Sequence, residues 1–230
     1  MEPDDNDLDD DSPVRLAIIN ILILSNNLPP THVLPPLLEQ FPKLATSANP
    51  YERRGAMGAL GAVMEGSPDF MADYIEDILH LVFRSLRDPE PTVIRAALVA
   101  LGQITEELPT EVTKHHVTMV PVVFELLGSN DLEIVKAACT SLDAILEWVP
   151  KEAVEQYLPK LMEALLYIMT TDVDSDVKII VAGISQHIIV LICSGNWNSC
   201  TCFKGRVLCL PRIVNAYFLQ HERSRWWRTP

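Results

Sequence analysis

The sequence predicts an all-α protein, a right-handed HEAT-repeat α-solenoid of about four and a half helix pairs. Two observations favour this fold: similar segments recur about every 40 residues, and the apolar residues within each segment follow a helical period. Glycine is also scarce, with 9 in 230 residues, and this suits helices. A helix pair of this kind buries its apolar face only by stacking on its neighbours, so the repeats should form one continuous array.

The repeat is clearest in a basic residue followed by two small ones. This pattern stands at Arg54, Arg95 and Lys136, so that positions 54, 95 and 136 give the same interval of 41 twice. The frame extends outward to Arg15 and to Lys178, at intervals of 39 and 42. Leucines repeat the same interval of 41, at Leu60, Leu101 and Leu142. A period near 40 with two helices per unit is typical of HEAT and armadillo repeats.

Each unit is expected to contain a first helix, a short polar turn and a second helix. We expect a lone second helix at 13–27, then pairs at 31–46 with 50–65, 70–86 with 91–107, 112–127 with 131–148, and 152–170 with 174–191. Pro50 and Pro91 suit the first turn of a helix, where a backbone N–H has no helical acceptor. Pro121 and Pro159 fall within or at the start of first helices, so they should kink or restart them.

Charge divides the chain into three parts. Residues 1–12 form an acidic segment that we expect to be disordered, 13–192 the solenoid, and 193–230 a basic tail that should be poorly ordered. From position 196 onward there are six basic residues and one acidic, which leaves a net charge of −18 on positions 1–195. Such a body repels nucleic acid and anionic lipid and attracts basic partners, although acidic surfaces also serve solubility alone.

Membrane insertion and secretion are not expected. The apolar stretches 14–24 and 179–193 are shorter than the roughly 20 residues that span a bilayer, and the N-terminus is acidic where a signal peptide is basic. Cys139 is the only cysteine before position 190, which indicates a reducing compartment, the cytosol or nucleus.

An acidic series is the main candidate for a binding site. Glu65, Glu106 and Glu147 follow one another at intervals of 41, and Asp143 precedes the last of them by one helical turn. They should therefore line the concave face made by the second helices and form an acidic ladder across the repeats, a candidate site for basic segments. The alternative is an ordinary solvated helix face.

A second acidic candidate for a binding contact lies at the start of the chain. It consists of Asp4, Asp5, Asp7, Asp9, Asp10 and Asp11. Its conformation should be unstructured, because like charges repel.

No catalytic, cofactor or metal site is predicted. Cys193, Cys200, Cys202 and Cys209 lack the paired C-x₂₋₄-C spacing of structural zinc sites. His115 and His116 are consecutive on a helix, so they point about 100° apart. Phosphate loops, nucleophile elbows and His-Glu-x-x-His motifs are absent from the sequence, so we expect no enzyme activity.

Several runs carry a family resemblance. They are NPYERR from Asn49, AMGALG from Ala56, EGSPDF from Glu65, SPVRLA from Ser12, and SLDAILE from Ser141. Over about 10–190 the chain resembles the importin-β (karyopherin-β) superfamily. It looks closest to the importin subunit beta-four branch and its fungal ribosomal-protein and histone importers.

The resemblance implies a nuclear import receptor. Such a receptor binds basic cargo, including ribosomal proteins and histones, on its concave face, releases it to the GTP-bound GTPase Ran, and touches FG nucleoporins outside. It would shuttle between cytoplasm and nucleus through the pore. In the family an acidic loop within the solenoid contributes to cargo or Ran contacts, and the run at 2–11 is a candidate for it.

The chain also departs from the family. Members are several times longer, with about twenty repeats, so the N-terminal Ran-binding repeats are not expected in this segment, and Ran and FG nucleoporins would bind through the full-length parent. Residues 193–230 do not resemble the family, and we expect a truncated gene model or altered splicing to account for them.

The alternative class is a HEAT-repeat structural scaffold, such as a phosphatase regulatory subunit, without a transport role. A tubulin-binding array should show basic, Trp-bearing turns, and the turns RDPE from Arg87 and GSND from Gly128 do not fit that pattern.

Overall fold

The computed structural model describes residues 13–149, 151–170 and 175–193, and every regular element in these ranges is a helix. They fall into two units, residues 1–148 and 149–230, which are described separately. The first contains α1 (Pro13–Asn27), α2 (Pro30–Ala45), α3 (Pro50–Gly66), α4 (Pro68–Met71), η1 (Ala72–Tyr74), α5 (Ile75–Ser85), α6 (Pro91–Glu107), α7 (Pro109–Val112), η2 (Thr113–His115), α8 (His116–Leu127) and α9 (Leu132–Trp148). The second contains α10 (Lys151–Thr170) and α11 (Ser175–Cys193).

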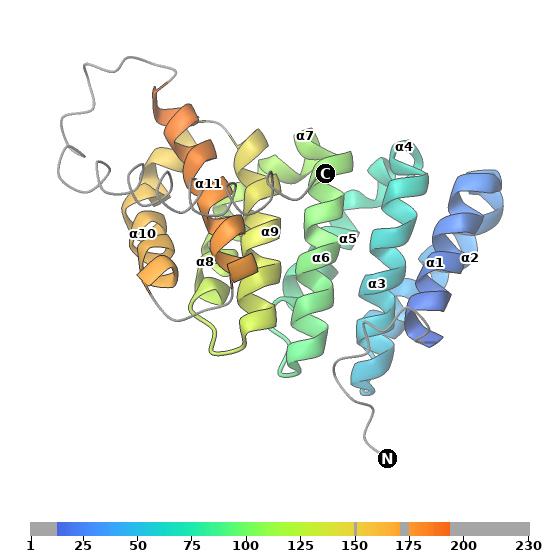
Figure 1. The fold of residues 1–230 in the computed structure, drawn as a ribbon. Helices are drawn as coiled ribbons and strands as arrows, with labels where there is room; N and C mark the ends of the chain where they lie inside the picture. Colours follow the sequence, from blue (N-terminus) through green and yellow to red (C-terminus); the bar gives the residue numbers. More distant parts are fainter. Residues whose placement is uncertain (1–12, 150, 171–174, 194–230) are drawn as a thin grey trace, which may run out of the picture. The chain divides into compact units, whose positions relative to one another are not determined.

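The first unit has two layers. Helices α1, α3, α6 and α9 are the second helices of successive repeats and pack side by side in chain order (Figure 1). Helices α2, α5 and α8 form the other layer, and each contacts the second helix of its own repeat. The predicted all-α HEAT-type repeat fold is confirmed.

Apolar residues at the repeat interval form the core between the layers. Leu60, Leu101 and Leu142 are each fully buried, as their regular spacing predicts. In the second unit α10 and α11 pack against each other, and Leu161, Leu165 and Val181 are buried there.

Helix starts follow local capping chemistry. The side chain of Asn49 accepts a hydrogen bond from the Tyr51 backbone N–H at 3.0 Å, and Pro50 occupies the first turn of α3. Asp131 Oδ1 has the same role for α9, accepting from the N–H of Glu133 at 2.9 Å and of Ile134 at 3.3 Å. These contacts account for the close agreement between the predicted and observed starts of both helices.

The first helices differ from prediction in two ways. The ranges 70–86 and 112–127 were expected to be continuous, but short 3₁₀ turns at η1 and η2 separate α4 from α5 and α7 from α8. In the second case the Pro109 carbonyl accepts from both the Thr113 backbone N–H and the Thr113 hydroxyl, the latter at 2.8 Å.

The sequence predicted a kink or a restart at Pro121 and Pro159. The restart is wrong, because α8 and α10 continue through these prolines, and the kink stays a prediction. Helix α2 likewise contains Pro35, Pro36 and Pro42. In α3 and α6, by contrast, proline stands only at the first position.

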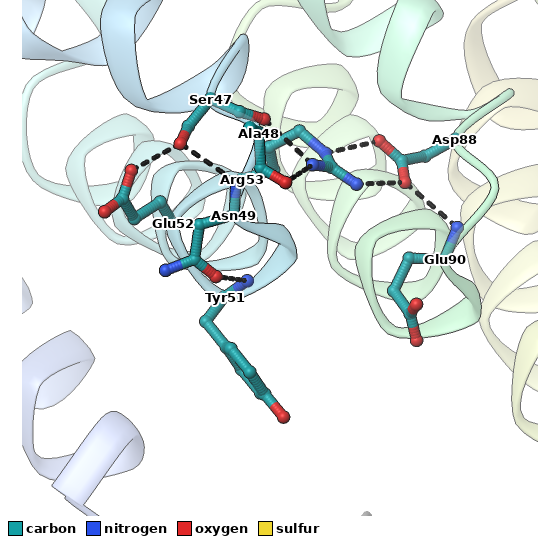
Figure 2. A network of polar contacts seen from close by, with 8 residues as sticks. All are labelled: Ser47, Ala48, Asn49, Tyr51, Glu52, Arg53, Asp88 and Glu90. Atoms are coloured by element: carbon teal, nitrogen blue, oxygen red, sulfur yellow. Dashed lines mark hydrogen bonds and ion pairs between the residues drawn. The ribbon is translucent and has the colours of Figure 1, made fainter.

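An ion pair joins the first turn of α3 to the turn before α6 (Figure 2). Arg53 donates to both carboxylate oxygens of Asp88, at 2.7 and 2.8 Å, and to the carbonyl oxygens of Ser47 and Ala48, at 2.8 and 3.2 Å. Asp88 Oδ1 also accepts from the Glu90 N–H at 3.0 Å. Only 14% and 9% of the Arg53 and Asp88 side chains remain exposed, so water screens this contact less than an ordinary surface pair.

The two partners shift each other's pKa. The hydrogen bond to Asp88 raises the pKa of Arg53 above its usual value. Burial by itself would raise the pKa of Asp88, but the hydrogen bonds from Arg53 and the Glu90 backbone, with the charges of Arg53 and Arg84, lower it on balance. The contact therefore favours the charged form of both side chains.

A buried hydroxyl joins α6 to α9. Ser141 Oγ lies 2.6 Å from the Leu98 carbonyl oxygen of α6 and 2.9 Å from that of Ala137 in its own helix. Gly102 lies against Ser141, and a Cβ added at Gly102 would stand 3.7 Å from the nearest Ser141 atoms, an ordinary contact distance. The two helices therefore approach closely without strain.

Glycine permits a still closer approach between α1 and α3. A Cβ added at Gly66 would lie 2.5 Å from Ser25 Cβ and 2.9 Å from the Ser25 carbonyl carbon. The second of these is backbone and cannot turn aside, so only glycine fits where α3 ends. The outer face of α1 carries exposed apolar side chains, including Leu16, Ile23 and Leu24.

Candidate protein-binding face

The predicted acidic series lies on three neighbouring helices. Glu65, Glu106 and Glu147 each stand in the last turn of α3, α6 and α9, and each side chain is exposed. Helix α3 packs on α6 and α6 on α9, so the repeat places one glutamate at the same level of each helix. We call these three residues the acidic row.

The acidic row opposes helix stability. The carboxyl-terminal end of a helix carries partial negative charge, so a carboxylate there is unfavourable and a lysine or arginine would be favoured. None of these helices has a basic residue in its last turn. Within the described residues no hydrogen bond or ion pair involves any of the three carboxylates. The fold does not need these charges, and they remain available to a partner.

Asp143 differs from the row. It is half-buried on α9, one turn before Glu147, and its charge acts on the buried Cys139. Burial raises the pKa of Cys139 to about 12, and the Asp143 carboxylate adds to this effect. Cys139 is therefore a neutral, buried thiol rather than a nucleophile.

A basic row shares the face. Arg54, Arg95 and Lys136 are half-buried near the start of α3, α6 and α9, eleven positions before the glutamates. At a rise of 1.5 Å per residue the two rows lie about 16 Å apart along the helices. Between them Val99 and Thr140 are exposed, whereas Ala62 and Ala144 are buried, so the surface between the two rows is only partly exposed.

The remaining candidates lie elsewhere. Asp4, Asp5, Asp7, Asp9, Asp10 and Asp11 are outside the described residues, as are Cys200, Cys202 and Cys209. Cys193 is the last residue of α11. In the described ranges no group of three His, Cys, Asp or Glu side chains could hold a metal ion, and no described helix is long and apolar enough to cross a membrane.

The sequence analysis missed the Arg53–Asp88 pair. It aligned Arg54 across the repeats, whereas the pairing side chain is the arginine before it. The partners are 35 residues apart, less than one repeat. An arginine just inside one second helix and an aspartate in the next turn are the signal that could have found the pair.

A match to a known family indicates the class of protein. Residues 30–122 match the family described as "Stalled ribosome sensor GCN1-like, HEAT repeats". With the two-layer array described above, this defines the chain as a HEAT-repeat protein.

A more particular likeness follows from a curated protein. Over 88 residues the chain is 37% identical to "Probable importin subunit beta-4" of Schizosaccharomyces pombe, a match that covers 38% of this chain and 8% of that protein. The resemblance to the importin-β superfamily predicted from the sequence is confirmed by this match.

Solved structures of Kap121p share the fold. The crystal structure of Kap121p matches with a TM-score of 0.74 and 22% identity, covering 94% of this chain and 22% of that one. Kap121p bound to RanGTP matches with a TM-score of 0.70 and 21% identity, over 90% of this chain and 22% of that one. Kap121p bound to Pho4p gives 0.71 and 21%, over 94% and 24%. This chain therefore spans less than a quarter of the length of these relatives.

Proposed function

We propose that this chain is a segment of a nuclear import receptor and that its acidic row binds basic segments of protein cargo. The observation that carries the proposal is the row itself: three exposed, unpaired glutamates in register, each at the helix end where it disfavours folding. One Kap121p structure is of a variant with three acidic residues replaced by lysine at intervals of about one repeat. That variant is a precedent for testing such a series by replacing its acidic residues with lysine.

The geometry limits the ligand. Packed helices lie about 8–10 Å apart, and an extended chain advances about 3.3 Å per residue. A peptide crossing the helices would therefore meet a new glutamate about every third residue. We propose that the preferred segments carry lysine or arginine at that spacing, as segments of histones and ribosomal proteins could. The acidic run at 2–11 and Asp143 are proposed as additional contacts.

The longer parent would complete the transport cycle. The solved relatives include Kap121p bound to RanGTP and to Pho4p. By analogy we propose that the parent of this chain binds Ran and FG nucleoporins, shuttles between cytoplasm and nucleus through the pore, and acts by binding alone, with no catalysis and no nucleic-acid or membrane ligand.

Binding should be weak per contact and sensitive to salt. An exposed ion pair contributes at most about 1 kcal/mol, and exposed charges are screened beyond about 10 Å at 0.1 M salt. A fluorescence titration with a nine-residue peptide bearing lysine at every third position should give an affinity that falls steeply between low and physiological salt. A peptide of identical composition with its three lysines adjacent should bind more weakly.

A matched pair of variants separates the row from net charge. Glu65→Lys, Glu106→Lys and Glu147→Lys together should abolish binding. Glu39→Lys, Asp77→Lys and Glu125→Lys together change net charge equally but lie on the other layer, in α2, α5 and α8. This control should lose only a small part of the affinity. Equal losses in both variants, or an affinity insensitive to salt, would refute the row as a binding site.

The basic row favours one alternative, a structural scaffold of the phosphatase-regulatory-subunit type. Arg54, Arg95 and Lys136 would attract an acidic segment rather than a basic one. In that case an acidic peptide would bind more tightly than the lysine peptide, and the acidic-row variant would strengthen its binding.

A further inference from the structure

A hollow lies beside the first end of the acidic row. It has a volume of about 500 Å³ and lies between the start of α2 and the junction of α3 with α4. The residues that line it include Pro30, Gly66, Ser67, Asp69, Phe70 and Asp73. Ser67 follows Glu65, the first glutamate of the acidic row, by two positions.

The Ser67 hydroxyl is buried without a hydrogen-bond partner among the described residues. Its side chain is 6% exposed, and its hydroxyl is the only buried side-chain oxygen or nitrogen in the described ranges that makes no hydrogen bond. A buried hydroxyl without a partner is unfavourable, and native proteins rarely retain one. A ligand or an ordered water in the hollow can satisfy the group.

The positions equivalent to Ser67 in the next two repeats hold apolar residues. One and two repeats later, at intervals of 41, the equivalent positions hold Leu108 and Val149, each followed by a proline as Ser67 is. Val149 is 3% exposed. An aliphatic side chain therefore satisfies this corner of the repeat, and serine at position 67 is not required by the fold.

Free negative charge and an aromatic ring share the hollow. Asp69 and Asp73 are exposed, and no ion pair in the described part of the chain involves either of them. Phe70 lines the same space, with its ring stacked on Tyr74 at a centroid distance of 6.1 Å.

The next repeat neutralises the equivalent positions. Lys114 stands where Asp73 does and pairs with Glu111, which stands where Phe70 does. Two repeats later Lys151 stands where Asp69 does and Glu155 where Asp73 does. Of these three repeats, only the first therefore has carboxylates at both positions.

We infer that this hollow binds the arginine side chain of a basic peptide. A guanidinium is planar, presents five N–H donors, and stacks on aromatic rings. Asp69 and Asp73 would accept from its two edges, the Phe70 ring would cover its face, and Ser67 Oγ would accept a remaining N–H. The inference rests on the proposed function and deepens it, because it names arginine as the residue that anchors a basic segment beyond Glu65.

The test compares arginine with citrulline, which has the same shape but no charge. A five-residue peptide with one central arginine, titrated into the full ¹⁵N-labelled chain, should shift the amide signals of Gly66, Ser67 and Asp69. The citrulline peptide should leave them unchanged. Equal shifts with both peptides would overturn the inference.

Two variants locate the contact. Ser67→Val should fold at least as stably as the parent, as Val149 indicates, yet bind the arginine peptide about ten-fold more weakly, the usual effect of losing a hydrogen bond to a charged group. Asp69→Asn with Asp73→Asn should remove the shifts altogether. An unchanged affinity in Ser67→Val, with the fold intact by circular dichroism, would refute the assignment.

A further variant keeps the two proposals apart. Glu106→Lys with Glu147→Lys should weaken the nine-residue lysine peptide and leave the single-arginine peptide bound. If arginine and citrulline bind alike while the lysine peptide still depends on the row, the hollow fails and the acidic row stands. If the lysine peptide is indifferent to the row but arginine still selects the hollow, the reverse holds.

Discussion

The junction of α3 with α6 and the junction of α6 with α9 share one repeat geometry but use different polar contacts. The first is joined at the turns by the Arg53–Asp88 pair, and the second near the middle of the helices by the Ser141 hydroxyl on the Leu98 carbonyl. One repeat after Arg53 and Asp88 stand Ile94 and Ser129, so the ion pair cannot form at the second junction.

The turn contact itself is retained in all three turns. Ser47 Oγ accepts from the Asn49 N–H, Asp88 Oδ1 from the Glu90 N–H, and Ser129 Oγ from the Asp131 N–H. The repeat therefore requires an acceptor at this position, and the charge on Asp88 is an addition to it. Stacking geometry comes from the apolar core, while each junction selects its own polar contact.

The largest effect should follow from removing the charge at Asp88. Asp88→Ser keeps a turn acceptor, as Ser47 and Ser129 do, but leaves the partly buried Arg53 guanidinium without its partner. We expect a loss of about 1–3 kcal/mol in the free energy of unfolding by urea denaturation, the usual range for hydrogen bonds to charged groups. Arg53→Ile with Asp88→Ser copies the second junction, and it should recover part of this loss.

The same variant has a predicted pH dependence. The pKa of Asp88 is lowered in the folded protein, so its stabilising contribution is present above the unfolded value, about 3.9, and is lost as the pH falls through the folded value. The difference in stability between the parent and Asp88→Ser should therefore be constant near pH 7 and shrink below about pH 4. A difference that grows on acidification would contradict the assignment.

A smaller effect is expected at the second junction. Ser141→Ala removes the hydroxyl but leaves the Leu98 carbonyl its helical donor, and Ala100 occupies the equivalent position of α6, fully buried. We expect a loss of about 0.5–1.5 kcal/mol, independent of salt and of pH between 5 and 8. Calorimetry that shows a salt-dependent loss would contradict a neutral hydrogen bond as the cause.

The smallest effect should be a gain. Gly102→Ala adds a methyl group at ordinary contact distance from Ser141 and improves helix propensity, so it should stabilise the protein by about 0.5–1 kcal/mol. Gly55→Ala, where no atom lies within 4 Å of the added carbon, reports the propensity gain alone. A loss at Gly102 with a gain at Gly55 would show that α6 and α9 lie closer than described.

Periodicity predicted the helices well because burial at a fixed interval is a property of the sequence itself. Leu60, Leu101 and Leu142 identified the core, and the exposure of Glu65, Glu106 and Glu147 followed from the same frame. The 3₁₀ turns at η1 and η2 escaped prediction because a three-residue change in the helical hydrogen-bond pattern leaves the apolar spacing of the sequence almost unchanged.

The hollow beside Ser67 also escaped prediction. From the sequence, the run at 65–70 indicated only a family resemblance. A comparison of Ser67 with Leu108 and Val149 would have revealed a polar residue at an apolar position. Its burial without a hydrogen-bond partner depends on how α2 and α4 meet, which a one-dimensional pattern does not contain.

The placement of proline makes the two layers of the first unit mechanically unequal. Each proline inside α2 or α8 deletes a longitudinal hydrogen bond, whereas those of α3 and α6 stand where no bond is lost. Helices α3 and α6 are thus stiffer along their axes, and α2 and α8 are more compliant. A pull along the helix axes should therefore strain α2 and α8 more than α3 and α6.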